Sequence, residues 1–267
     1  AWCGIVPERC MPWVCAVSNG SDQEPDTSGR FTECFGVKTQ PRAMCFWQYD
    51  THGVTLWLDV RCGGSGVILQ GRKLKVCEIV FGEYRDIPAF AALKSYYALL
   101  CDSPRLPDHK VYGTNNWYYA YGKISHASVI KDTKLLTKLC TGNANRPYMV
   151  IDSGWEKYDG TAPWDAVREG KFHDMKALAD EIRALGARPG IWVRPLRDQM
   201  YAIFPKGHAA RSLRNPEFLD PSHPKTLDFV RETINLLCSQ GYELIKHDFT
   251  TFDTLGFWGF ERHREFA

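Results

Sequence analysis

From about residue 110 onward, short apolar stretches alternate with longer amphipathic ones, and this alternation limits the chain to few folds. Residues 148–152 read Tyr-Met-Val-Ile-Asp, which is typical of a short buried strand. Residues 224–240 carry apolar side chains at helical spacing and are followed by Gly241, a common helix stop. Further strands are expected within 111–121 and at 189–195 and 244–248, and further helices at 129–140 and 173–185. Such alternation predicts a parallel sheet covered by helices.

Four strand–helix units correspond to the first half of a (β/α)8 barrel of the TIM type, which we place at residues 110–267. A doubly wound open sheet is the alternative, but no Gly-rich dinucleotide turn follows the first strand. Half a barrel would leave an unpaired apolar edge. We therefore expect the natural protein to continue beyond residue 267.

The preceding part of the chain has a different pattern. Residues 43–49, 54–61 and 73–81 are rich in aromatic and β-branched residues and are separated by turn sequences, which predicts an antiparallel β-sandwich over residues 1–87. Residues 88–101 return to helical spacing. Two prolines follow, so residues 88–109 are interpreted as a helix and a linker between two domains.

Composition excludes several functional classes. The formal net charge is +2, so nothing favours nucleic acid or an anionic membrane as a partner, and no apolar run is long enough to span a membrane. Ten cysteines occur without a C-x-x-C pair, so we expect no metal site. Several cysteines lie in apolar runs, which favours free thiols and a cytoplasmic location, although the even count also permits disulfides. Assembly into a homo-oligomer is left open.

Polar and aromatic side chains gather where each predicted strand ends. Lys246 and Asp248 are two residues apart, so on a strand they point to the same face. At the carboxyl end of a barrel strand this pair could form an active site, with the lysine keeping the aspartate ionised as a nucleophile. A plain salt bridge is the structural alternative, and a Schiff-base lysine is a weaker chemical one. The other strands contribute Asn115, Asn116, Trp117, Asp152, Ser153, Trp155, Trp192, Arg194 and Arg197.

These strand-end motifs resemble those of glycoside hydrolase family 36, within the clan of retaining α-galactosidases and α-N-acetylgalactosaminidases. That family carries an Asp-Asp-Gly-Trp-like motif after the second strand, where this chain has 152–155, Asp-Ser-Gly-Trp. It carries Gly-x-Trp on the third strand, here 190–192, and Lys-x-Asp on the fourth, here 246–248. Residues 115–119 and 219–224 also look like its segments. The resemblance implies that residues 1–87 are the carboxyl-terminal part of a β-supersandwich.

The resemblance also implies roles for individual residues. Asp248 would be the nucleophile that forms a glycosyl-enzyme intermediate, and Lys246 would bind a sugar hydroxyl. Asp152 would accept hydrogen bonds from the hydroxyls that distinguish galactose, while Trp155 and Trp192 would form the pocket walls. Arg194, Asn116, Trp117 and Ser153 complete the expected substrate-binding set. The implied substrate is an α-galactoside oligosaccharide or glycoconjugate, and the chemistry needs no cofactor.

Two features depart from the family pattern. Ser153 replaces an aspartate, which leaves strict galactose specificity open and keeps N-acetylgalactosamine as an alternative. A retaining enzyme also needs a second carboxyl group as acid/base, which in the family lies on a later strand, and we assign none in this chain. This chain alone therefore lacks an assigned group for one part of the hydrolysis. A non-catalytic carbohydrate-binding relative is the alternative function.

Overall fold

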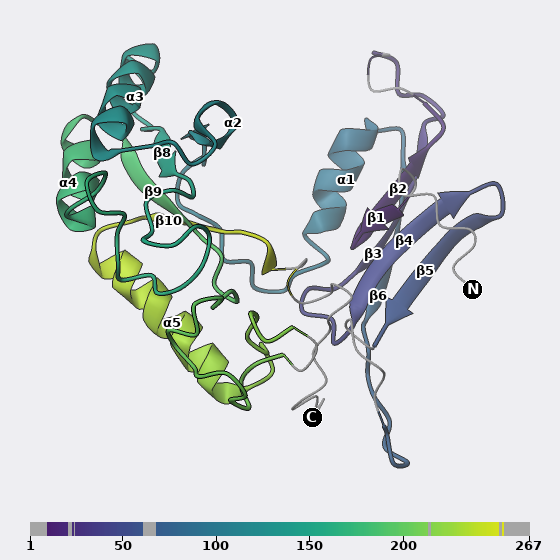
Figure 1. Ribbon diagram of the computed structural model, residues 1–267. Coiled ribbons are helices and arrows are strands. Elements are labelled where there is room, and N and C mark those ends of the chain that lie inside the picture. Colours follow the sequence, from purple (N-terminus) through teal and green to yellow (C-terminus); the bar gives the residue numbers. More distant parts are fainter. Residues whose placement is uncertain are drawn as a thin grey trace. The chain divides into compact units, whose positions relative to one another are not determined.

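The computed structural model describes residues 10–20, 23, 25–60, 68–212, 215–250 and 253. The chain divides into two compact units, with the boundary between Leu106 and Pro107, and each is described by itself (Figure 1). All seven cysteines whose side chains are described are free thiols.

Two three-stranded antiparallel sheets build the first unit. One has the order β1-β4-β5 and the other β2-β3-β6. Side chains from both sheets pack together in one core, among them Cys15 and Val37 from the second sheet and Cys45 and Trp47 from the first. This confirms the expected β-sandwich. The strands are β1 (Cys10–Pro12), β2 (Val14–Ser18), β3 (Phe31–Val37), β4 (Met44–Asp50), β5 (Gly53–Asp59) and β6 (Ile79–Arg85).

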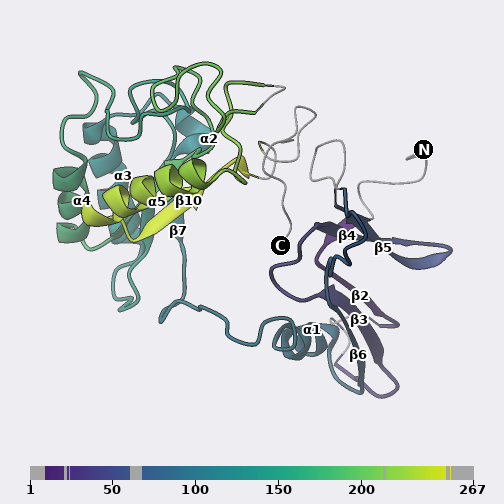
Figure 2. The same ribbon diagram turned by 90° about the horizontal axis from the view of Figure 1, so that it is seen from below.

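Helix α1 (Ala89–Tyr97) belongs to this first unit, where it lies beside β2, β3 and β6 (Figure 2). Tyr96 is fully buried with Cys34 and Leu100. Its hydroxyl donates a hydrogen bond to the carbonyl of Val80 at 2.5 Å. The helix ends at Tyr97, four residues before the expected end.

The strand expected at 73–81 is wrong over most of its length, because β6 begins only at Ile79. Residues 73–78 alternate lysine with apolar residues and so imitate a strand pattern. They hold only separate backbone contacts, such as Arg42 N to Val76 O at 2.7 Å and Lys38 N to Glu78 O at 2.9 Å. The continuous ladder with β3 starts where Ile79 pairs with Val37.

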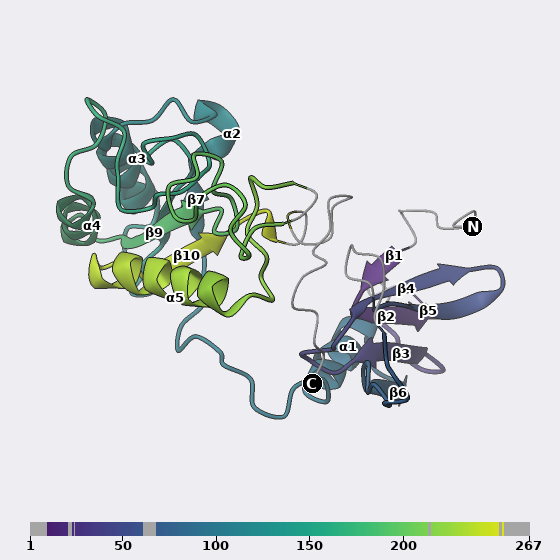
Figure 3. The ribbon, with the colours of Figure 1, turned by 60° about the horizontal axis from the view of Figure 1, so that its bottom comes forward.

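Four parallel strands in the order β7-β8-β9-β10 form the sheet of the second unit. They are β7 (Gly113–Asn115), β8 (Tyr148–Ile151), β9 (Arg188–Val193) and β10 (Leu244–His247). Helices α3 (His126–Leu139), α4 (Met175–Ala184) and α5 (Pro224–Ser239) lie along one side of this sheet, and the short α2 (Trp117–Ala120) follows β7 (Figures 1 and 3). The predicted strand–helix alternation is therefore confirmed, with bounds that agree to within three residues.

Local signals fix the ends of the helices. Ser125 caps α3 and Asp174 caps α4 through their side chains, and Pro224 opens α5. The inner faces of α4 and α5 bury Leu178, Ile182 and Leu237 against the sheet. The strand order follows the sequence without the reversal of a doubly wound sheet. The described strands do not close into a barrel, so the barrel stays a prediction.

Two long excursions follow the strands on the same edge of this sheet. Residues 152–174 connect β8 to α4, and residues 194–223 connect β9 to α5. Gly154, in the first excursion, has φ +120°, and a Cβ atom there would lie 2.4 Å from the carbonyl oxygen of Gly122. Only glycine permits this approach, which explains its place in the Asp-Ser-Gly-Trp sequence.

Candidate active site

A cavity of about 530 Å³ lies at the carboxyl-terminal edge of the parallel sheet. Its walls come from α2, from the two long excursions and from the end of β10. The described lining residues are Trp117, Tyr118, Asp152, Ser153, Asp159, Gly160, Trp192, Arg194, Arg197, Lys246, Asp248 and Phe249. Seven of the nine residues expected from the sequence are among them.

The Lys246 ammonium lies between two carboxylates at the base of this cavity. Its Nζ atom is 2.7 Å from Asp152 Oδ2 and 3.4 Å from Asp248 Oδ2. Burial alone would lower the pKa of Lys246, but the hydrogen bonds and negative charges of Asp152 and Asp248 outweigh it, so the pKa is raised. A Schiff-base lysine needs a lowered pKa, so this environment argues against that chemistry.

Asp248 has donors on both carboxylate oxygens. Trp192 Nε1 donates to Oδ2 at 2.7 Å, and the backbone N–H of Phe249 donates to Oδ1 at 2.9 Å. Burial would raise the pKa of Asp248, but these two hydrogen bonds and the Lys246 ammonium together lower it. The lowered pKa keeps the carboxylate ionised at neutral pH. The side chain is 35% exposed, so it is also reachable from the cavity. These are the properties of a carboxylate nucleophile.

Asp152 is almost fully buried, with 2% of its surface exposed. Its Oδ2 accepts hydrogen bonds from Lys246 at 2.7 Å and from Asn115 Nδ2 at 2.5 Å, and its Oδ1 accepts one from the Ser153 N–H at 2.8 Å. An ionised carboxylate has about four acceptor sites. Three are filled by the protein, which leaves about one for a ligand hydroxyl.

Asn115 and Asn116 have different positions. The Asn115 side chain reaches Asp152, as described above, although Asn116 was the residue expected at the site. Asn116 Oδ1 instead accepts the backbone N–H of Asp152 at 2.9 Å. Asn116 lines a separate hollow of about 170 Å³ near α3, together with Leu135 and Met149. Asn116 therefore holds the backbone of Asp152, and Asn115 orients its carboxylate.

A buried glutamate shapes the turn after Asp152. Glu156 is fully buried and accepts hydrogen bonds from the Ser153 hydroxyl at 2.6 Å, the Gly154 N–H at 2.9 Å and the Gly160 N–H at 2.8 Å. The Ser153 proton is thus used inside the protein, while its oxygen can still accept. Sequence reasoning missed Glu156, because a glutamate in a predicted loop is usually solvated.

The tryptophans form two layers. Trp192 and Trp117 line the cavity. Trp155 was expected to form a wall with them, but it lies behind, with 1% of its surface exposed, and its indole N–H donates to the Trp192 carbonyl at 3.0 Å. Trp164 contacts both rings, with centroid separations of 6.1 Å to Trp155 and 6.0 Å to Trp192. Trp155 thus supports the strand that carries Trp192.

Arg194 lines the cavity but is engaged by the protein. Its guanidinium makes two hydrogen bonds to Asp253, at 2.9 Å and 2.6 Å, and Asp253 is fully buried. The guanidinium also lies 4.4 Å from the ring centroid of Phe249. Arg197, Asp159, Tyr118 and Phe249 line the cavity as well and were not in the expected set. Tyr118 lies on the short helix α2, and the positions of the other three depend on loop conformation, which carries no periodic signal.

Other site types find no support in the described part of the chain. No group of three or more His, Cys, Asp or Glu residues there is placed to hold a metal ion. Within the same residues, no helix has the length and apolar character needed to cross a membrane.

The chain resembles known proteins in its structure but matches none of the protein families or curated sequences. No protein-family model matches the chain, and no curated protein does. Solved structures of α-galactosidases do match. The Lactobacillus brevis α-galactosidase superimposes with a TM-score of 0.59 at 15% identity, covering 88% of this chain and 36% of that one.

Two further matches have similar values. The family 36 α-galactosidase AgaA of Geobacillus stearothermophilus gives a TM-score of 0.55 at 17% identity, over 89% of this chain and 37% of that one. TtGalA of Thermus thermophilus, in complex with p-nitrophenyl α-D-galactopyranoside, gives 0.52 at 18%, over 84% and 44%. The chain spans less than half the length of these enzymes. It has the fold of a β-sandwich and α/β part of family 36 α-galactosidases, so the resemblance seen in the motifs is confirmed as a likeness of structure.

Proposed function

We propose that the protein is a retaining α-glycoside hydrolase of the α-galactosidase type, with the parallel sheet forming the first half of a (β/α)8 barrel. The observation that carries the proposal is the arrangement of Lys246 between Asp152 and Asp248 at the carboxyl-terminal edge of the sheet. The likeness in fold to solved α-galactosidases supports it. The expected substrate is a terminal α-galactoside of an oligosaccharide or glycoconjugate.

Asp248 is the nucleophile in this mechanism. Its ionised carboxylate attacks the anomeric carbon, the bond to the leaving group breaks, and a glycosyl ester forms on Asp248. Trp192 and Lys246 hold the carboxylate in one orientation. Water then hydrolyses the ester with the help of a second carboxyl group, for which no residue is assigned here.

Asp152 and Lys246 bind the sugar hydroxyls. One acceptor site of Asp152 is free for a hydroxyl, and Lys246 donates from the same side. The ring of Trp117 provides an apolar wall for the sugar's C–H faces, and the Trp192 indole, which is 2% exposed, contributes only an edge to the cavity. Because Ser153 is neutral, α-N-acetylgalactosamine is retained as an alternative sugar.

A carbohydrate-binding protein without turnover is the second candidate. The lining carboxylates other than Asp248 hold ion pairs, Asp152 with Lys246 and Asp159 with Arg168. Each of these carboxylates in the described part of the chain is thus already engaged by a cation, which favours binding without turnover.

The test is incubation of the full chain with a fluorinated α-galactosyl trapping reagent, followed by intact-mass measurement and peptide mapping. We expect a mass increase of one sugar on Asp248, and no increase in Asp248→Ala, with both proteins giving the same circular dichroism spectrum. An adduct on another residue would refute the assignment of the nucleophile. Binding of galactose by calorimetry without any adduct would favour the carbohydrate-binding alternative.

A further inference from the structure

The cations that line the cavity differ in how their charge is balanced. Lys246 contacts two carboxylates, those of Asp152 and Asp248. Arg194 is matched by Asp253, which forms two hydrogen bonds with it. For both cations, a charge inside the protein already occupies the position that an anionic ligand would take.

Arg197 has no such partner. Its Nη2 donates to the neutral Gln199 Oε1 at 2.5 Å, and its Nη1 makes a long contact of 3.4 Å to the backbone carbonyl of Asp159. The Asp159 carboxylate pairs with Arg168 instead. Among the described residues, no carboxylate lies within ion-pair distance of Arg197, and its buried Nε–H has no acceptor.

The position of Arg197 relative to the reacting group follows from Trp192 and Gly160. A Cβ atom on Gly160 would lie 3.5 Å from Arg197 Nη1 and 3.5 Å from the Cη2 atom of Trp192. The opposite edge of the same indole donates its N–H to Asp248. Arg197 and Asp248 thus lie near the same tryptophan, and both line the same cavity, so one ligand in the cavity can reach both.

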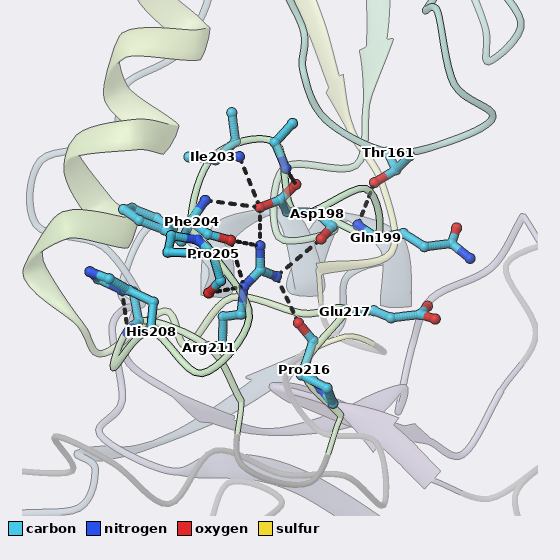
Figure 4. A network of polar contacts seen from close by, with 12 residues as sticks. Thr161, Asp198, Gln199, Ile203, Phe204, Pro205, His208, Arg211, Pro216 and Glu217 are labelled. Carbon is cyan, nitrogen blue, oxygen red and sulfur yellow. Dashed lines mark hydrogen bonds and ion pairs between the residues drawn. The ribbon is translucent and has the colours of Figure 1, made fainter.

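The loop that carries Arg197 is held firmly. Asp198, the next residue, accepts the backbone N–H groups of Ala202, Ile203 and Phe204 and pairs with Arg211, and both charged side chains are buried (Figure 4). Burial and the neighbouring charge of Arg194 lower the pKa of Arg197, and the more distant carboxylates of Glu217, Asp253 and Asp159 offset this only in part. A guanidinium remains charged at neutral pH all the same.

We propose that Arg197 binds an oxyanion carried by the substrate, so that this site takes an acidic α-galactoside bearing a carboxylate, sulfate or phosphate group. The inference rests on the proposed function and deepens it. A guanidinium fork presents several N–H donors to an oxyanion, and Nη1 of Arg197, which holds only the long contact to the Asp159 carbonyl, is the donor closest to being free for one. Gly160, Arg197 and Trp192 all line the same cavity, so a group bound there lies within reach of the guanidinium.

The oxyanion has two possible positions, on the sugar ring or on the leaving group. Calorimetry on the full chain separates them with two matched ligand pairs. Galactose is compared with galactose 6-sulfate for the ring position, and phenyl α-galactoside is compared with its 4-carboxyphenyl counterpart for the leaving-group position. In one of the two pairs, we expect the acidic ligand to bind about tenfold more tightly than the neutral one.

Two variants show whether Arg197 causes this preference. We expect Arg197→Gln to make the two affinities of that pair equal and Arg197→Lys to retain part of the difference. The matched control is Arg231→Gln, which removes the same charge from an exposed ion pair on α5 and should leave both affinities unchanged. The preference should also weaken with added salt, which a purely structural role of Arg197 would not explain.

The outcomes separate this inference from the proposed function. If both neutral ligands bind and neither acidic counterpart binds more tightly, the inference is overturned while the proposed function stands. If no ligand of either kind binds, both fail. Should Arg197→Gln not fold, the comparison of the two ligand pairs on the unaltered protein still decides the question.

Discussion

At the scale of single residues, the protonation state of Asp248 depends on the hydrogen bond from the Trp192 indole. We expect Trp192→Phe to remove the 2.7 Å hydrogen bond and to raise the pKa of Asp248 toward its ordinary value. The lowered pKa of Asp248 stabilises the folded protein above the ordinary carboxylate range and stops doing so as the pH falls through the folded value. Protonated Asp248 cannot attack the trapping reagent, so the trapping rate falls as the pH drops through its pKa. In the variant, which has the higher pKa, this fall should occur at a higher pH.

The measurement is an NMR titration with labelled aspartate carboxylates, supported by the pH dependence of trapping. Trp164→Phe is the matched control, because Trp164 is also buried and its indole N–H has no partner among the described residues. Equal titration curves in the two variants would mean that the indole N–H does not control Asp248.

Residues of the candidate site could be predicted where they follow a strand. Lys246 and Asp248 lie on β10 or directly after it, so period-two alternation placed them on one face, whereas Trp192 on β9 was identified through the family resemblance. Asn115 and Arg197 were noted as strand-end residues without an assigned role, and Glu156 was missed, because its role arises from contacts inside a loop. The pairing of Arg194 with Asp253 joins positions 59 apart, and no local pattern encodes it.

At the scale of elements, the excursion after β9 depends on one buried ion pair. Arg211 is 2% exposed and donates to the Asp198 carboxylate and to backbone carbonyls of this loop, including that of Pro216 at 2.7 Å (Figure 4). We expect Arg211→Met to reduce the free energy of unfolding by about 3–5 kcal/mol, because it leaves a buried carboxylate without its cation.

Urea unfolding at neutral pH measures this loss. The double variant Arg211→Met/Asp198→Asn should lose less than the sum of the two single changes, because the uncompensated charge is gone. Arg231→Gln breaks an exposed pair and should cost at most about 1 kcal/mol. A loss for Arg211→Met as small as that of the control would show that the pair does not hold the loop.

The regular elements of the second unit could be predicted more closely than its loops. Apolar residues facing a sheet repeat with the helical period, and caps such as Asp174 and Pro224 mark the starts of helices. In the first unit, residues 73–78 had a strand-like pattern but make only separate backbone contacts and no continuous ladder, so alternation alone was misleading there.

At the scale of the whole molecule, the chain between the two units is exposed. Residues 102–108 lie on the surface without regular structure, whereas each unit has a core of its own. We expect trypsin to cut early after Arg105 or Lys110 and to leave two pieces, which mass spectrometry identifies. The variant Arg105→Gln/Lys110→Gln should resist this cut. If trypsin cut within α3 or α5 earlier in time than within residues 102–110, the connecting segment would not be the most accessible part of the chain.

The Lys246–Asp152 ion pair joins positions 94 apart in the chain. Contacts of such long sequence separation carry a large loop-closure cost, so they form after the helices and local turns. The cavity therefore exists only once β10 has docked beside β9, the last pairing along the described sheet. During refolding, recovery of sugar binding should lag behind recovery of helical content. The rate at which binding recovers therefore reports the rate of the final pairing step, the docking of β10 beside β9.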